Sequence, residues 1–369
     1  MKRSWFSFLI LCLLALAVAA QETPTQPTAS MLPDISIIGN AIGTLTNGES
    51  ADIDDHLQLQ EVEVVFGAGI YPGIRGDVVI ALHDPDFSAE VEEGYVTIEQ
   101  FTSSAPVGGR IGILRIPFGK VNPVHPHQLP YADLPLVTRN LLGEEFIGNG
   151  FEVSGLLTPG DAFLQAQVGR WKAREQHHEE EGEEHEHGGA AFHDRFTTAR
   201  LWTGLPISTK SEVEIGVSGG WGQGYHEELD NAGNLVDIHR PDITLYGADV
   251  TWRKWLPRER RLLLQAEAVR REQKGDEKTK QFGFVALGTF QPSKFVELGA
   301  RYDWTQVPVE EGDPAAHLSG VSLFATRYLN ETTFLRGQVT RGQNHKGETE
   351  HTVTLQLVFG FGPHAHVLQ

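Results

Sequence analysis

The chain has 369 residues and a formal net charge of −19, with 49 acidic against 30 basic residues. This acidic balance argues against a nucleic-acid partner, and a single cysteine, Cys12, excludes a disulfide-stabilised scaffold. Apolar residues do not recur at the 3.6-residue spacing that an α-helical protein of this length would show.

Residues 1–20 are predicted to be a secretory signal peptide. Two basic residues are followed by an apolar run over residues 5–16 and then by small residues. The apolar run is too short for a membrane-spanning helix, which needs about 20 residues. Cleavage would remove Cys12 and leave 28 basic and 49 acidic residues, a formal charge of −21. Residues 21–34 are predicted to form a short N-terminal linker.

The rest of the chain alternates apolar and polar residues with a period of two. Val353, Leu355 and Leu357 share one face of a segment near the C-terminus, and Tyr246 and Val250 share one face of another. Such alternation predicts strands with two different sides, and aromatic residues near strand ends are typical of strands that cross a bilayer. The predicted strands cover residues 35–44, 58–70, 74–82, 91–101, 109–118, 149–157, 162–171, 196–205, 210–221, 243–255, 261–272, 280–291, 295–305, 319–328, 332–342 and 351–361.

The connections between these segments alternate in length. Short ones, such as 71–73 and 292–294, alternate with mostly longer ones that include 119–148 and 172–195. Tight turns at one end, long loops at the other and an even strand number are typical of outer-membrane barrels, whereas a soluble sandwich does not sort its loops in this way. We therefore predict an all-β fold, a transmembrane antiparallel up-and-down β-barrel of about sixteen strands. It spans residues 35–362, with a tail at 363–369, in the outer membrane of a Gram-negative-type bacterium.

These features together resemble the bacterial porins, with the phosphate-selective porins as the nearest sub-type. Residues 118–137, FGKVNPVHPHQLPYADLPLV, also resemble a segment of uncharacterised porin-like outer-membrane proteins. The resemblance covers essentially the whole exported chain in architecture. It implies a passive channel, insertion by the barrel-assembly machinery and a homotrimer. One departure is that porins usually end on an aromatic residue, whereas PHAHVLQ follows Phe361 here.

The strand faces opposite the aromatic ones are expected to line the lumen. More acids than arginines, and no lysine, are assigned to these faces, which favours cations and small polar solutes. The missing lysines speak against the anion selectivity of the phosphate-selective sub-type, and the alternative is that the charges pair across strands. The assigned residues are Glu61, Glu63, Asp77, Glu99, Glu212, Glu214, Asp249, Glu267, Glu297 and Asp303, with Arg75, Arg115, Arg253, Arg271, Arg301 and Arg336.

The connection 119–148 is expected to fold inward and narrow the pore. Its length of about 30 residues suggests a functional role, and prolines at 117, 123, 126 and 130 stiffen its first half. The alternative is an outer loop that packs on its neighbours. His125, His127 and Asp133 could also form an open divalent-metal site. The predicted constriction and pore-lining residues are His125, His127, Asp133, Arg139, Glu144 and Glu145 of this connection, with Lys120 also in it, and Arg115, Glu99, Asp249, Glu297, Arg301 and Asp303 of the wall.

Residues 175–189, EQHHEEEGEEHEHGG, lie on a predicted outer loop. Histidine-rich tracts bind metals weakly, so this loop is a candidate for weak binding of Zn²⁺ or another divalent cation. The alternative is a solvated loop whose composition cannot bury itself. The candidate ligands are His177, His178, His185, His187 and His193.

The predicted function is a porin-like channel for passive diffusion of small hydrophilic solutes, with a cation bias and a link to zinc uptake. The expected partners are outer-membrane lipid, small polar solutes or cations, and further copies of the chain. No cofactor is required. An enzyme is not expected, because no serine stands in a recognisable nucleophile motif. The alternative is a non-transport surface protein whose histidine- and glutamate-rich loop binds metal or a partner.

Overall fold

The computed structural model describes residues 33–47, 57–84, 87–143, 146–174, 191–229, 235–275, 278–307, 317–343 and 347–362. The chain divides into two units, residues 1–33 and 34–369, and every element named below belongs to the second. The predicted signal peptide, the tail and most of the linker lie outside the described residues. The same holds for Glu144, Glu145 and the histidine-rich stretch 175–190.

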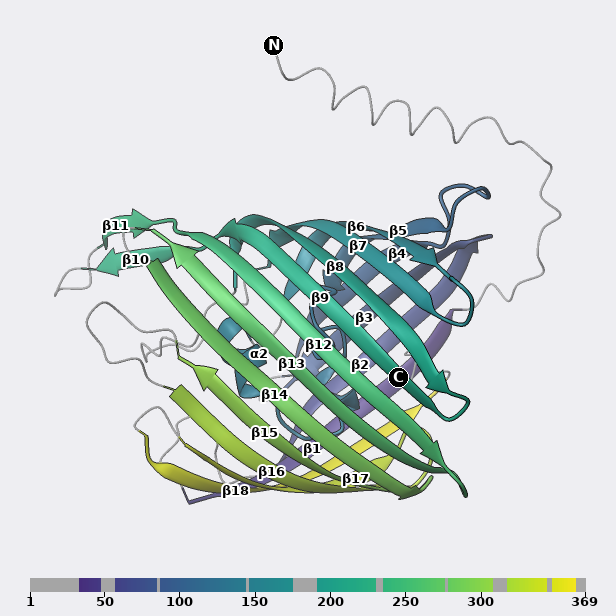
Figure 1. Ribbon diagram of the computed structural model, residues 1–369. Coiled ribbons are helices and arrows are strands. Elements are labelled where there is room, and N and C mark those ends of the chain that lie inside the picture. Colours follow the sequence, from purple (N-terminus) through teal and green to yellow (C-terminus); the bar gives the residue numbers. More distant parts are fainter. Residues whose placement is uncertain are drawn as a thin grey trace, which may run out of the picture. The chain divides into compact units, whose positions relative to one another are not determined.

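Sixteen antiparallel strands close into a barrel, as predicted (Figure 1). Each barrel strand pairs with the barrel strand that follows it in the chain, so that β9 pairs with β12. Strand β1 closes the ring by pairing with β18. The strands are β1 Asp34–Thr46, β2 Leu57–Tyr71, β3 Ile74–His83, β4 Ser88–Ile98, β5 Val107–Arg115, β6 Ile147–Leu157, β7 Phe163–Ala173, β8 His193–Ser208, β9 Ser211–Gln223, β12 Asp242–Leu256, β13 Arg260–Lys274, β14 Lys278–Ser293, β15 Val296–Gln306, β16 His317–Tyr328, β17 Phe334–Gln343 and β18 Thr349–Phe361.

The predicted strand bounds agree with these to within three residues. Between β9 and β12, the short strands β10 (His226–Leu229) and β11 (Leu235–His239) form a separate two-stranded sheet. Among the described residues, no helix has the length and apolar character needed to span a membrane.

The two faces of the barrel wall differ as the alternation predicts. On β12, Tyr246 and Val250 are 48% and 42% exposed on the outside. Their neighbours Asp249 and Arg253 are buried on the inside. Because successive side chains of a strand point to opposite sides, one regular strand supplies both an apolar outer surface and a polar inner wall.

The interior is partly filled by the connection between β5 and β6. We call residues 116–146 the inner loop; 144 and 145 lie outside the described residues. The loop contains a short 3-10 helix, η1 (Pro126–Gln128), and a six-residue α-helix, α2 (Leu136–Leu141). Helix α2 contacts β13, β14 and β15, and Figure 1 shows it among the strands of the barrel.

Candidate functional site

The inner loop is buried against the inner wall, in agreement with the expected inward fold. Its apolar side chains Phe118, Leu141 and Phe146 belong to a buried cluster that includes residues of the wall. The ring of Phe146 stacks on that of Phe196 of β8, with a centroid separation of 5.4 Å and an angle of 22° between the planes. Burial of these aromatic and aliphatic groups stabilises the loop in this position.

The start of the loop is bound by a single carboxylate of β13. The backbone N–H groups of Lys120 and Val121 donate to Oε2 of Glu267, over 2.6 and 3.0 Å. This approach requires glycine at position 119, because φ is 65° there and a Cβ would lie 2.1 Å from Oε1 of Glu267. A residue with a side chain would be strained and would push the carboxylate away. The Lys120 side chain also pairs with Glu214.

A second set of contacts, which we call the arginine anchor, consists of Asp133 with Arg301, Asp303, Arg336 and Gln338. Arg301 donates from Nη2 to Oδ2 of Asp133 over 2.7 Å and from Nη1 to the Asp133 carbonyl over 2.8 Å. Its Nε donates to Asp303 over 2.6 Å, and its guanidinium lies 4.4 Å from the centre of the Tyr131 ring. The loop is therefore held on β15 by charge-assisted hydrogen bonds.

Strand β17 completes the arginine anchor. Arg336 donates to the carbonyl of Tyr131 over 2.9 Å and to Gln356 over 2.7 Å. Gln338 accepts from the N–H of Ala132 over 3.0 Å and donates to Asp133. The Asp133 side chain is still 43% exposed. Burial raises its pKa, but the Arg301 guanidinium lowers it further, and the net pKa lies below its usual value.

A third set, the histidine anchor, consists of His125 and His127 with Glu61, Glu63, Glu92, Glu93 and Arg115. His125 Nδ1 lies 3.2 Å from Glu63 Oε1 and 3.5 Å from Glu92 Oε2, and its Nε2 lies 2.9 Å from Glu93 Oε1. His127 Nδ1 lies 3.1 Å from the same Glu63 oxygen. Both histidines are 2% exposed. Burial lowers the pKa of His125, but the charge of Glu63 raises it more, to a net value well above the ordinary one.

Glu92 and Glu93 were missed by the sequence analysis because of a β-bulge. Along β4 the pairing with β3 shifts between Val79 and Ile80, so that Glu92 is the extra residue. Both neighbouring carboxylates are buried, 3% and 6% exposed, which regular alternation does not allow. Arg115 contacts both of them, and Arg174 donates to the backbone carbonyl of Glu92 over 3.1 Å.

The grouping of His125 and His127 with Asp133 in one metal site is wrong. Asp133 is bound to Arg301 and Gln338 in the arginine anchor, whereas the histidines contact Glu63 on β2. The loop turns its two halves toward different parts of the wall. The sequence places these residues close together in the chain, but it does not show which wall each one meets.

The other residues of the predicted constriction and wall differ in burial and in their partners. Asp249 is buried in a pair with Arg200, at 2.7 and 3.0 Å. Glu297 is buried and accepts from the Tyr328 hydroxyl over 2.7 Å. Glu99 is exposed and follows the end of β4 by one residue, although the predicted strand included it. Arg139 lies half-buried on α2.

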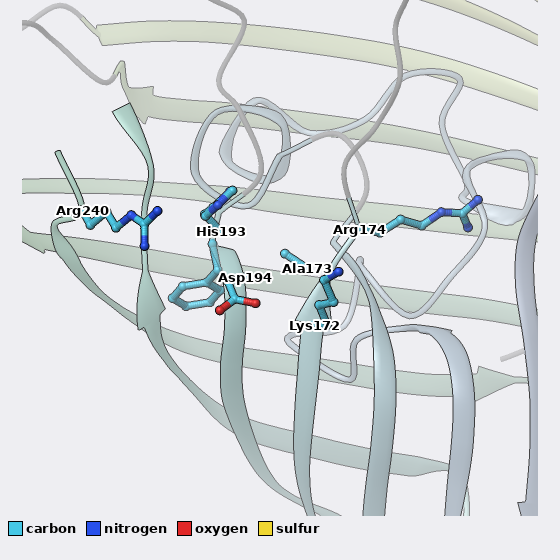
Figure 2. A pocket seen from close by; sticks show the side chains of 7 residues that line it. Lys172, Ala173, Arg174, His193, Asp194 and Arg240 are labelled. Atoms are coloured by element: carbon cyan, nitrogen blue, oxygen red, sulfur yellow. The ribbon is translucent and has the colours of Figure 1, made fainter. Parts of the chain in front are cut away.

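Two further hollows have linings that include none of the anchor residues. One, of about 300 Å³, is lined by Lys172, Arg174, His193, Asp194 and Arg240 (Figure 2). His193 begins β8 and stacks on Tyr225 with ring centres 4.5 Å apart; the other predicted histidine ligands lie outside the described residues. The second hollow, of about 220 Å³, is lined by polar groups that include Glu99, Arg110, Glu152, Gln165 and Gln167.

The architecture matches solved structures of outer-membrane proteins. OmpT of Vibrio cholerae, in a form lacking loop L8, matches with a TM-score of 0.60 and 12% identity, over 89% of this chain and 99% of that one. A trimer form of OmpT matches with a TM-score of 0.58, 12% identity and coverage of 89% and 100%. An anion-selective porin from Comamonas acidovorans matches with a TM-score of 0.57, 11% identity and coverage of 89% and 98%. The barrel has the porin fold.

This likeness is structural. No protein-family model matches the sequence, and no characterised protein matches it at the sequence level. At identities of 10–12% the porin fold is established without a sub-type, and the phosphate-selective sub-type stays a prediction. The porin-fold barrel, with an apolar outside and a polar inside, fits an outer-membrane location.

Proposed function

We propose that the chain is an outer-membrane channel through which small hydrophilic solutes diffuse passively, with the inner loop as its constriction. The observation that carries this proposal is the attachment of one loop to nearly opposite parts of the inner wall, at Glu93 on β4 and at Arg301 on β15. A barrel of sixteen strands is wide enough to hold water. A loop bound on both sides narrows that space without filling it.

Finer features of the proposal concern solutes and assembly. We propose a bias toward cations, because acids outnumber arginines among the assigned wall residues and Asp133 of the loop is exposed. A contribution to zinc uptake rests on the histidine-rich stretch 175–189. A homotrimer, lipid contacts over the apolar outer face and insertion by the barrel-assembly machinery complete the proposal; a trimer form is recorded for the structurally similar OmpT.

Neighbouring residues of β7 allow a matched test of the channel. Gln167 lines the second hollow together with the buried Glu152, whereas Val168 is 54% exposed on the outer face. Apart from Cys12 in the predicted signal peptide, the sequence has no cysteine, so Gln167→Cys and Val168→Cys would each carry one thiol. In planar bilayers we expect stepwise single-channel currents, which a charged thiol reagent reduces in Gln167→Cys and leaves unchanged in Val168→Cys.

Two outcomes would contradict parts of this proposal separately. Folded protein that gives no current steps would refute the channel and favour a surface protein whose loops are the active part. Reversal potentials in a salt gradient should favour K⁺ over Cl⁻. A preference for Cl⁻ would refute the cation bias and leave the channel intact.

A further inference from the structure

The histidine anchor brings together three donor atoms at the spacing that a tetrahedral metal ion requires. Glu63 Oε1 lies 3.2 Å from Nδ1 of His125 and 3.1 Å from Nδ1 of His127. An ion with bonds of about 2.0–2.1 Å separates its tetrahedral ligand atoms by about 3.3 Å. Donor atoms of all three residues lie within 4.8 Å of one another. The spacing therefore suits one ion between the inner loop and β2.

His127 is the side chain that the protein groups leave unsatisfied. It is 2% exposed, and neither ring nitrogen makes a hydrogen bond among the described residues; Nδ1 lies 3.1 Å from Glu63 Oε1 without hydrogen-bond geometry, and Nε2 makes no contact of this kind. Oε2 of Glu63 is likewise buried without a hydrogen bond. A buried polar group without a partner costs free energy, and coordination of a metal by the imidazole and the carboxylate would remove this cost.

The charge of the anchor points to the same kind of ligand. Carboxylates from Glu61, Glu63, Glu92 and Glu93 are buried together, and Arg115 contributes one positive charge through Glu92 and Glu93. Glu61, Glu63 and Glu92 also offer donor oxygens within 4.8 Å of one another. Several buried carboxylates against one guanidinium require additional positive charge, from protons or from a cation.

We propose that Glu63, His125 and His127 bind a divalent transition-metal ion such as Zn²⁺, which fastens the inner loop to the wall at β2. Two imidazoles and a carboxylate, without thiolates, form a ligand set that suits Zn²⁺ and related divalent ions. Glu61 or Glu92 is placed to supply a further oxygen. Because both histidines are buried, the ion has a structural role. The site is separate from the histidine-rich stretch 175–189, and it does not depend on channel activity.

The competing explanation is an imidazolium at His125 that neutralises the carboxylates without any metal. Both explanations account for the contacts of His125, but the imidazolium leaves the buried ring nitrogens of His127 without a hydrogen bond among the described residues. Binding measurements separate them, because a protonated network has no affinity for a metal beyond that of the outer loop.

The experiment uses the full exported chain, refolded without metal, titrated with Zn²⁺ against a chromophoric chelator. We expect one tight site per chain. His127→Gln should weaken it by at least about 100-fold, more than the loss of an outer-shell partner typically costs. His351→Gln, an exposed histidine at the edge of β18, is the matched control and should leave the site unchanged. Deletion of 175–189 should remove weak binding and keep the tight site.

The unfolding temperature is a second measurement, and it tests the structural role of the ion. It also keeps the test decisive if His127→Gln does not fold. Zn²⁺ should raise the unfolding temperature of the wild-type protein, and Glu63→Gln should abolish this increase. Wild-type protein that folds but shows no tight site would overturn the proposal, and so would a tight site that survives His127→Gln and disappears with residues 175–189. Current measurements play no part, so failure here is distinct from failure of the channel proposal.

Discussion

The arginine and histidine anchors hold the same loop with different charge balances, the first even and the second acidic. At the arginine anchor, Arg301 lies between the carboxylates of Asp133 and Asp303, and their remaining contacts are hydrogen bonds from Gln338 and the Leu136 N–H. At the histidine anchor, carboxylates are in excess and His127 lacks hydrogen bonds among the described residues. The comparison shows that the protein's own groups complete one anchor, whereas the other needs protons or a metal ion.

The largest expected effect comes from removing the central cation of the arginine anchor. Arg301 and Asp303 have side chains that are each 2% exposed. Arg301→Met would leave a buried carboxylate without its partner, so we expect a loss of about 3–5 kcal/mol in the free energy of unfolding. Urea unfolding of the protein refolded into lipid vesicles measures this loss.

The matched control is an arginine whose ion pair is exposed. Arg270 on β13 pairs with Glu272 over 2.5 Å, and its side chain is 47% exposed. Arg270→Met should cost less than about 1 kcal/mol, as exposed pairs do. Similar losses for the two variants would show that the arginine anchor does not hold the loop and would remove one side of the comparison.

The opposite response is expected when one of the excess carboxylates of the histidine anchor is neutralised. Glu61 is 8% exposed and lies beside Glu63 and Glu92. In metal-free protein, Glu61→Gln removes a like charge and the cost of burying it. The free energy of unfolding should therefore stay the same or rise by up to about 1 kcal/mol. The same urea experiment measures it.

Asp303→Asn is the companion variant at the arginine anchor, and it should destabilise, because it removes a carboxylate that Arg301 uses. If Glu61→Gln destabilises the metal-free protein as much as Asp303→Asn does, the histidine anchor has no excess of negative charge. The contrast between the anchors would then be lost.

The barrel and its two faces follow from local patterns, so the sequence predicts them well. Tyr246 and Asp249 lie on the expected sides of β12 because the period of two is a property of every regular strand. The inward fold of the inner loop was also predictable, since a polar connection of that length needs partners. The prolines and the loop's length are visible without any tertiary information.

The partners inside the barrel depend on contacts that no local pattern records. His125 meets Glu63, 62 positions earlier in the chain, whereas Asp133 meets Arg301, 168 positions later. The bulge at Glu92 adds a second difficulty, because one extra residue in β4 turns two consecutive carboxylates inward. An alternating pattern assigns only one of them to the lumen. Which wall a loop residue meets is decided by the closed barrel as a whole.

The smallest expected effect is the pH dependence that Asp133 gives to the arginine anchor. In the folded protein, burial raises the pKa of Asp133, but Arg301 lowers it further, so the net pKa is depressed. A depressed pKa stabilises the fold above the unfolded value of about 3.9, and this stabilisation disappears as the pH falls through the folded pKa. The difference in unfolding free energy between wild type and Asp133→Asn should therefore be constant above about pH 5 and shrink below about pH 4. Because the Asp133 side chain is 43% exposed, the change should be below about 1 kcal/mol.

A difference that grows as the pH falls would mean that Arg301 does not stabilise the Asp133 carboxylate. The arginine anchor would then depend on Asp303 alone.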